Sequence, residues 1–391
     1  MSRRLARFCV EEFLITILYS GAHMGFNCGI VGLPNVGKST LFNAVTKAGA
    51  QAANYPFCTI EPNVGRVPMP DERLDLINNI VKAKRLVPTF MEFVDIAGLV
   101  KGASKGEGLG NQFLGHIRQV DAIVHVVRCF DNPDITHVDG DTNPGRDIDT
   151  INTELIYADY ETVVKSVDRL SKIVKHQDKK IIASHECGLR LRAHLEAIQP
   201  ARSLNLISPE EEEYVQSLHL ITRKPVLYAA NVDETDLGDE GARSVHVKAL
   251  REIAVREKAR VVVVSARIEE ELSQLEPEEA KIYLDDLKVT ESGLSRLIRE
   301  GYELLGLMTY FTAGVQEIRA WTVPRAAKAP QAAGVIHTDF EKGFICAEVY
   351  AFKDLMRLGN EAKVREAGMY RKEGKEYVVQ DGDIMNFLFN V

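Results

Sequence analysis

The sequence predicts an α/β fold: a doubly wound, mostly parallel sheet with a helical insertion, followed by a smaller α+β domain. Two observations predict it. Between residues 26 and 305, short runs of β-branched and aromatic residues alternate with helix-like segments, which is the pattern of βαβ units. Beyond that point the pattern changes to short alternating segments with small-residue turns, at 311–322, 344–352, 376–379 and 384–388.

Five apolar runs are the predicted strands of the parallel sheet. A strand covered on both faces is apolar throughout rather than alternating. The runs are Phe26–Val31, Thr89–Val94, Ala122–Val127, Pro225–Ala230 and Arg260–Ser265. Helix-like segments accompany them, such as Thr40–Lys47 and Ser292–Leu305.

Length and composition indicate a soluble protein of two or three domains. The chain has 391 residues, 45% hydrophobic and 27% charged, which is ordinary for globular proteins. A net charge of −8 argues against a protein that coats nucleic acid with its whole surface. Six scattered cysteines without C-x-x-C spacing predict reduced thiols in a cytoplasmic protein.

Residues 1–23 are expected to lie outside the fold. A basic start and a short apolar run resemble an export signal, but Glu11 and Glu12 interrupt them. We expect an N-terminal extension, with Met24 opening the folded chain. No stretch has the length of a membrane span, so no membrane partner is expected.

Residues 32–39 read Gly-Leu-Pro-Asn-Val-Gly-Lys-Ser, a G-x-x-x-x-G-K-[ST] loop between a predicted strand and a predicted helix. In that context the loop predicts a nucleotide site. Its glycines let backbone N–H groups converge on phosphates, Lys38 adds a positive charge, and the Ser39 hydroxyl suits Mg²⁺. The predicted phosphate-binding residues are Asn35, Val36, Gly37, Lys38, Ser39 and Thr40.

A second nucleotide element, Asp95-Ile96-Ala97-Gly98, follows a predicted strand. Asp95 is expected to support Mg²⁺, and the Gly98 N–H to contact the γ-phosphate. Thr59, in the loop 54–63, is the hydroxyl expected to reach the metal when a γ-phosphate is bound. The glycine-rich segment 98–110 is expected to order and disorder with the nucleotide state.

The residues after the fourth predicted strand decide which base the site prefers. Guanine sites use N-K-x-D, whose aspartate accepts two hydrogen bonds from the base, but here the tetrapeptide is Asn231-Val232-Asp233-Glu234. The longer glutamate side chain at 234 disturbs that pairing and favours adenine, read by backbone groups near Asn231 and Val232. Ser265 and Ala266 complete the base-side wall. A guanine site that tolerates Glu234 remains open.

The group that orients water for hydrolysis is less evident. Leu99 stands where Ras-like proteins carry a glutamine, and leucine cannot orient water. His137 and His116 are the candidates.

Residues 149–222 predict a helical hairpin inserted into the sheet domain. Val163, Val167, Leu170 and Val174 follow a 4-3-4 spacing typical of a coiled-coil-like helix. Residues 165–194 carry eight Lys/Arg against three Asp/Glu. Although such charges usually form a solvated face, this excess is the best candidate in the chain for RNA contact.

Two segments and the base tetrapeptide resemble the YchF/Obg-like ATPase subfamily of the Obg-related P-loop proteins. The segments are 95–114, from Asp95-Ile96-Ala97-Gly98 to Asn111-Gln112-Phe113-Leu114, and the C-terminal 381–391. The resemblance covers residues 24–391. It implies an Obg-type nucleotide-binding domain at 24–305 with a coiled-coil insertion, and a C-terminal TGS domain of β-grasp type at 306–391.

The same resemblance implies a Mg²⁺-dependent ATPase that prefers ATP to GTP and associates with ribosomes in the cytoplasm. It also implies that His137, in the segment Ile135-Thr136-His137-Val138, is a catalytic group. Lys38 and Gly98 are the other predicted catalytic residues, from the two nucleotide motifs above. Three alternatives stay open: a GTP-specific GTPase, a metabolic kinase, and a ribosome- or RNA-binding module with incidental hydrolysis.

Overall fold

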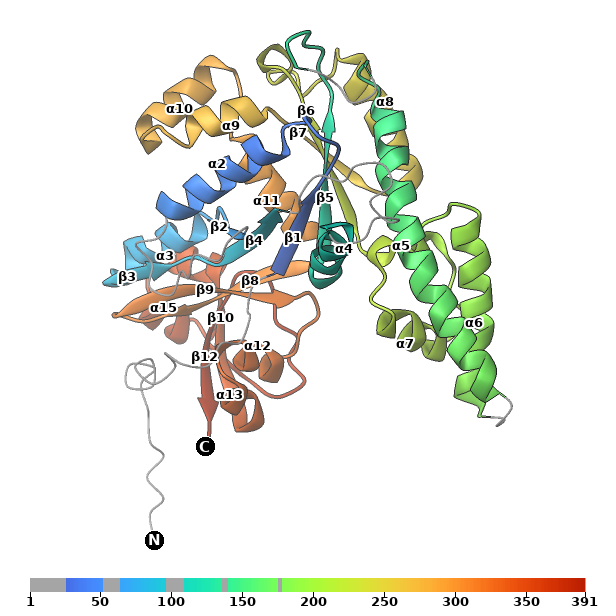
Figure 1. Ribbon diagram of the computed structural model, residues 1–391. Helices are drawn as coiled ribbons and strands as arrows, with labels where there is room; N and C mark the ends of the chain where they lie inside the picture. Colours follow the sequence, from blue (N-terminus) through green and yellow to red (C-terminus); the bar gives the residue numbers. More distant parts are fainter. Residues whose placement is uncertain (1–25, 52–63, 96–108, 136–139, 175–177, 391) are drawn as a thin grey trace. The chain divides into compact units, whose positions relative to one another are not determined.

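The computed structural model describes two compact units (Figure 1). The residues it describes are 26–51, 64–95, 109–135, 140–174 and 178–390. Residues 26–69 and 91–305 pack as one unit, and residues 70–90 and 306–390 as the other. Within those ranges, no helix is both long and apolar enough to cross a membrane.

The larger unit is built on a six-stranded sheet in the order β2-β4-β1-β5-β6-β7. All five predicted strands are present: β1 Phe26–Val31, β4 Phe90–Asp95, β5 Ala122–Arg128, β6 Val226–Asn231 and β7 Arg260–Val264. From β4 to β7 they pair in parallel. The prediction lacked the edge strand β2, Val64–Pro68, whose glycine and proline weaken the strand pattern.

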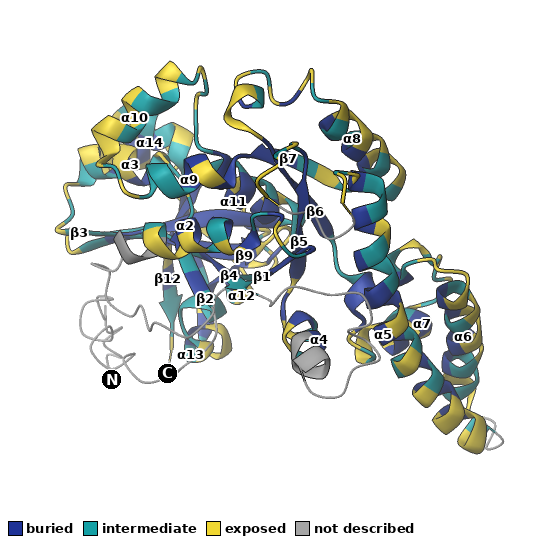
Figure 2. Ribbon diagram, turned by 45° about the horizontal axis from the view of Figure 1, so that its top comes forward, coloured by how far each residue is buried: buried dark blue, intermediate teal, exposed yellow. Residues whose placement is uncertain are grey.

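Helices cover both faces of this sheet, which leaves its central strands buried (Figure 2). On one face lie α2, Lys38–Gln51, and α11, Gly293–Leu304; on the other lie α4, Leu109–Gln119, α5, Pro144–Ile173, and α8, Val245–Glu257. Beyond β7 come α9, Ala266–Leu272, and α10, Pro277–Asp286. This is the doubly wound arrangement that the alternation of strands and helices predicts.

The insertion is a helical hairpin, as the heptad-like spacing predicts. The long helix α5 packs along α6, Lys179–Glu196, and α7, Pro209–Ser217, packs against α6 (Figure 1). Short 3₁₀ turns at Ala201–Ser203 and Ile221–Arg223 complete it. Val163, Val167 and Leu170 are buried in its core. Gly188 lets the helices approach, since a Cβ there would lie 2.9 Å from Val167 Cγ2.

The smaller unit holds a second six-stranded sheet, in the order β11-β10-β12-β8-β9-β3. Its strands are β3 Arg85–Val87, β8 Leu307–Ala313, β9 Glu317–Pro324, β10 Phe344–Ala351, β11 Arg371–Glu373 and β12 Asp383–Phe389. The predicted segment 311–322 is in fact an antiparallel hairpin of β8 and β9. The alternating segment 376–379 is not a strand: its pairing among the described residues is one isolated bridge, between Val378 and Lys328.

Helices pack on both faces of the second sheet as well. Neighbouring residues Tyr310 and Phe311 of β8 are fully buried in two different cores, because side chains alternate along a strand. The Tyr310 core includes α12, Ala329–Ile336, and α13, Thr338–Lys342. The Phe311 core includes α3, Arg73–Val81, α14, Phe352–Leu358, and α15, Glu361–Glu366.

Residues 70–90 therefore pack with the C-terminal sheet, although they fall within the predicted nucleotide-binding domain, 24–305. Leu74 and Ile77 of α3 are buried against residues that include Ile318. The strand β3 pairs in parallel with β9. The C-terminal unit is thus assembled from two separate stretches of chain.

Candidate nucleotide-binding site

The turn after β1 requires glycine at two positions. A Cβ on Gly32 would lie 2.5 Å from the carbonyl oxygen of Val126. Gly37 has φ +97°, and a Cβ there would overlap Nδ2 of Asn231. Other residues are strained in this backbone region or clash with these neighbours. The two glycines of the motif therefore fold the loop closely against β5 and β6.

The helix α2 begins directly at the end of this loop. Its first turn is closed by the Leu41 N–H, which donates to the Gly37 carbonyl at 2.9 Å. The amides of Lys38, Ser39 and Thr40 precede that bond and have no partner within the helix. The Ser39 side chain is exposed. This is the geometry of an anion site at a helix N-terminus, with a hydroxyl beside it.

Lys38 is buried, and its ammonium group points back along the loop. Its exposed fraction is 7%, and Nζ donates to the Leu33 carbonyl at 2.5 Å. Burial lowers the pKa of Lys38 to about 8, while the charge of Asp95 opposes the change. Burial also raises the pKa of Asp95, opposed by Lys38. The structure thus brings the P-loop lysine and the aspartate at the end of β4 into one electrostatic cluster.

Asn231, at the end of β6, joins the phosphate loop to the base-side wall. Its Nδ2 donates to the Val36 carbonyl at 2.9 Å, and its Oδ1 accepts the Ala266 N–H at 2.9 Å. The residue is 4% exposed. Its own carbonyl accepts the Cys129 N–H at 2.8 Å. Asn231 therefore braces the site, and these bonds use its side chain and its carbonyl.

The rest of the tetrapeptide divides into buried and exposed parts. Val232 is 2% exposed, and its N–H donates to the Val264 carbonyl at 2.8 Å. The Asn231 carbonyl and the Val232 N–H, two of the backbone groups predicted to read adenine, are thus already bonded to neighbouring strands. Glu234 is exposed. Ser265 and Ala266, both 3% exposed, begin α9 beside them.

Several predicted residues cannot be placed. Thr59, Gly98, Leu99 and His137 lie outside the described residues. His116, the other catalytic candidate, is exposed on α4. The described part of the site therefore consists of the phosphate loop, Asp95 and the base-side wall.

Comparisons with known proteins bear on this site. A family model described as a 50S ribosome-binding GTPase matches residues 27–182, and one for the C-terminal part of YchF GTPases, described as a protein of unknown function, matches residues 307–390. Proteins called ribosome-binding ATPase YchF from Bacillus subtilis and from Escherichia coli O157:H7 are 56% and 55% identical over 368 residues. Each alignment covers 94% of this chain and 100% of the relative. The chain belongs to the YchF family.

A solved YchF structure has the same fold. The YchF GTPase of Schizosaccharomyces pombe is 41% identical to this chain, with a TM-score of 0.83. The match covers 94% of this chain and 98% of the other. The predicted family and fold class are thereby confirmed.

Sequence reasoning missed Arg128, at the end of β5. Its guanidinium is buried and donates to the carbonyls of Phe130, Asn132 and Ile135, at 3.1, 3.1 and 2.9 Å. It also lies 4.7 Å from the ring centroid of Phe130. An arginine ending an apolar strand was the available signal. Arg128 holds the loop 130–135, which directly precedes the segment that carries His137.

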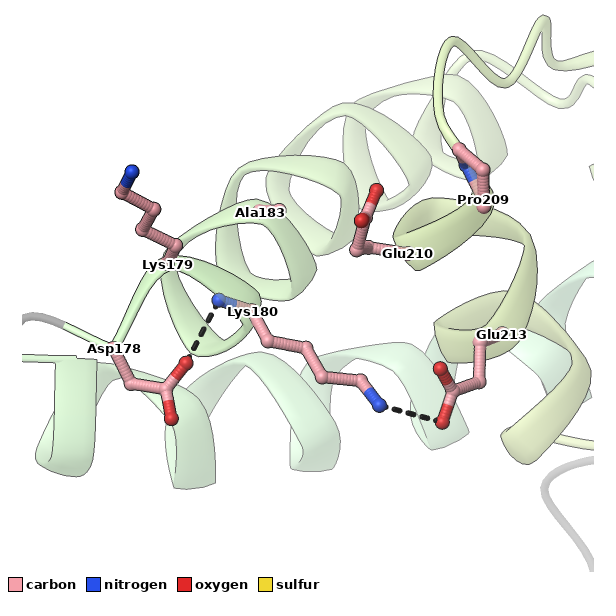
Figure 3. A pocket seen from close by; sticks show the side chains of 7 residues that line it. All are labelled: Asp178, Lys179, Lys180, Ala183, Pro209, Glu210 and Glu213. Carbon is pink, nitrogen blue, oxygen red and sulfur yellow. Dashed lines mark hydrogen bonds and ion pairs between the residues drawn. The ribbon is translucent and has the colours of Figure 1, made fainter.

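The insertion has an open depression near its tip, between the starts of α6 and α7 (Figure 3). Lys180 and Glu213 line it and form an ion pair at 2.7 Å. Farther along α6, Arg190 pairs with Glu211 at 2.5 Å. Part of the predicted basic excess is therefore neutralised by α7. On α5, however, Lys165, Arg169 and Lys172 are exposed at 4-3 spacing, so they share one face of that helix.

Proposed function

We propose that this protein is a cytoplasmic, Mg²⁺-dependent ATPase that acts as a ribosome-associated nucleotide switch and hydrolyses ATP, and GTP less well, to ADP and phosphate. The observation that carries the proposal is the cluster of phosphate loop, Lys38, Asp95 and Asn231 at one edge of the sheet. Full-length relatives that are called ribosome-binding ATPases support it.

In this proposal the phosphates bind to the amides from Asn35 to Thr40 and to the ammonium of Lys38. The ammonium stabilises the negative charge that develops on the transferred group. Ser39, Thr59 and Asp95 would hold Mg²⁺, since hydroxyl and carboxylate oxygens are the ligands of this hard cation. When bound, the ion would neutralise charge on the β- and γ-phosphate oxygens.

Two further groups would complete the reaction. The N–H of Gly98 would contact the γ-phosphate, and His137 would take or position the proton of the attacking water. Leu99 leaves the position used for water in Ras-like proteins without a polar side chain, so slow intrinsic turnover is expected.

The proposed preference for adenine rests on two hydrogen-bonding groups for guanine that this site does not supply. Glu234 lacks the geometry of the paired aspartate. The Ala266 N–H is donated to Asn231, so it is not available to the O6 carbonyl of guanine. Asn231, Val232, Ser265 and Ala266 would frame the base rather than read it by their side chains.

The switch would act on the ribosome through the insertion and the C-terminal unit. The exposed face of α5 that carries Lys165, Arg169 and Lys172 is the proposed RNA contact, because RNA binding draws much of its free energy from phosphate neutralisation. Reversing these charges should weaken ribosome association and reduce its salt dependence.

The test of the base preference is a side-by-side measurement of ATP and GTP affinity and hydrolysis. The double variant V232K/E234D restores N-K-x-D, and we expect it to shift preference toward GTP. An unchanged ratio of ATP to GTP affinity would overturn the inference from the tetrapeptide.

The test of the switch is ribosome association with an ATP analogue, with ADP and without nucleotide. In K38A the response to nucleotide should disappear, while association itself persists.

One observation favours a second candidate, a GTP-specific GTPase. The solved S. pombe relative is described as a GTPase, whereas the bacterial relatives are described as ATPases. The same affinity measurement separates the two.

A further inference from the structure

Glu269 is a buried acidic residue that the proposed reaction does not use. It lies on α9, one turn beyond the base-side wall formed by Ser265 and Ala266, and is 5% exposed. Its own N–H donates to the Ser265 carbonyl at 2.9 Å, in the first turn of that helix. A shift in the position of Glu269 would therefore also shift Ser265 and Ala266.

The carboxylate bonds to the start of another helix. Oε1 accepts the Gly293 N–H at 2.7 Å, at the N-terminus of α11. The Leu294 N–H and the Ser292 hydroxyl lie close enough to this carboxyl group to lower its pKa. The start of a helix presents unpaired N–H groups and partial positive charge, which a carboxylate satisfies. Glu269 thus ties α9 to α11.

The start of α11 is also held in place by close packing between Gly293 and Val264. A Cβ on Gly293 would lie 3.0 Å from Val264 Cγ1 and 3.1 Å from Val264 Cα. Val264 is the last residue of β7, immediately before the wall. The start of α11 therefore lies directly against the strand end that leads into Ser265.

The opposite side of the wall faces the phosphate loop. The Ala266 N–H bonds to Asn231, and the Cβ of Ala266 would lie 3.3 Å from a Cβ on Gly37. The wall is therefore held between two anchors: Asn231 on the side of the nucleotide and Glu269 on the side of α11.

We propose that Glu269 is a positioning residue that sets the place of the Ser265–Ala266 wall and so controls affinity for the nucleoside part of the nucleotide, and not for its phosphates. The proposal rests on the proposed nucleotide-binding function and deepens it. The phosphate loop has supports that do not pass through α9, because Gly32 lies against Val126 of β5 and Gly37 against Asn231 of β6. The helix α9 bonds to α11 through Glu269.

Burying the Glu269 carboxylate costs desolvation free energy, and this cost argues for a specific role. Burial raises the pKa of Glu269 to about 7, although the N–H groups of Leu294 and Gly293, the charge of Arg296 and the Ser292 hydroxyl lower it. An apolar side chain would fill this space without that desolvation cost. It could not, however, bond to the N–H groups that begin α11.

The experiment compares the binding of ATP with that of inorganic tripolyphosphate, each with Mg²⁺, by calorimetry on the full chain. We expect E269A to weaken ATP binding about tenfold, as for the loss of a charge-assisted hydrogen bond, and tripolyphosphate binding less than twofold. E269Q keeps one acceptor and should recover part of the ATP affinity. The matched control is E270A: it removes the neighbouring carboxylate of α9, which forms a 3.9 Å pair with Lys47, and should change neither affinity.

The outcomes separate the possibilities. Equal weakening of both ligands, or a lower melting temperature with unchanged ATP affinity, would overturn the positioning role and leave Glu269 as a stabilising residue only. If E269A does not fold, the same comparison is made with E269Q, which weakens the tie but keeps one acceptor oxygen for the Gly293 N–H. Failure of the proposed function looks different: the unchanged protein would bind ATP no more tightly than tripolyphosphate.

Discussion

Replacing Asn231 by alanine tests whether the brace between the phosphate loop and the base-side wall controls nucleotide affinity. The substitution removes two buried hydrogen bonds, both of 2.9 Å, and leaves the Val36 carbonyl and the Ala266 N–H without partners. A buried polar group left unsatisfied costs about 1 to 3 kcal/mol. Two such groups give about 2 to 6 kcal/mol. We expect the lower half of this range, because the space left by the side chain can admit water.

The phosphate loop and the Ser265–Ala266 wall can relieve part of that cost by moving apart. Such a movement would disrupt the nucleotide site. We therefore expect N231A to weaken ATP binding at least tenfold, which corresponds to about 1.4 kcal/mol, and to lower the melting temperature. Isothermal calorimetry and thermal unfolding measure the two effects. N231D is the finer variant: it keeps the acceptor for Ala266 but places an oxygen against the Val36 carbonyl.

The matched control is D233A, in the same tetrapeptide. Asp233 is exposed, and within the described residues its side chain bonds to Thr235, accepting the N–H at 3.3 Å and the hydroxyl at 3.4 Å. Its loss should cost no more than about 1 kcal/mol, as for a helix cap, with little change in affinity. If N231A binds ATP with unchanged affinity at an unchanged melting temperature, the reasoning from the two bonds is refuted.

Three other predictions concern the same edge of the sheet. G37A should abolish ATP binding, because the alanine Cβ would overlap Asn231 and the backbone has φ +97° there. The control G115A, on α4, should bind ATP normally, because a Cβ there meets nothing within 4 Å. A similar loss of ATP affinity in both variants would contradict this prediction. Since burial lowers the pKa of Lys38 to about 8, ATP binding should weaken and take up protons as the pH rises above about 8. Calorimetry in buffers of different ionisation enthalpy measures that uptake, and no uptake at pH 9 would refute it. R128K keeps the charge but replaces three separate guanidinium nitrogens, each bonded to a different carbonyl, by a single ammonium nitrogen. Hydrogen exchange in residues 130–135 should therefore accelerate and kcat should fall, and unchanged exchange would count against the role of Arg128.

The sheet of the larger unit could be predicted from sequence because its strands are buried on both faces. Continuous apolar runs place β1, β4, β5, β6 and β7 within a residue or two of their observed bounds. The edge strand β2 lacks that signal, since it is half-covered and contains glycine and proline. The phosphate loop could be predicted for a similar reason: its chemistry depends on residues adjacent in sequence.

Roles that depend on tertiary contacts could not be predicted. Nothing local shows that Glu269 bonds to Gly293, or that the side chain of Asn231 is used by Val36 and Ala266. The same holds for residues 70–90: an amphipathic helix shows that one face is buried, but not which core receives it.

The divided C-terminal unit has a consequence for synthesis of the chain. Thr89 and Thr322, whose hydroxyls lie 2.5 Å apart, are separated by 233 positions. During translation α3 and β3 therefore leave the ribosome long before β8 and β9 exist, at about 5 to 20 residues per second. For that interval Ile77, fully buried in the finished protein, has no native core to enter. A fragment that ends at residue 305 would keep this apolar surface exposed permanently, so the nucleotide-binding unit cannot be isolated cleanly by truncation alone.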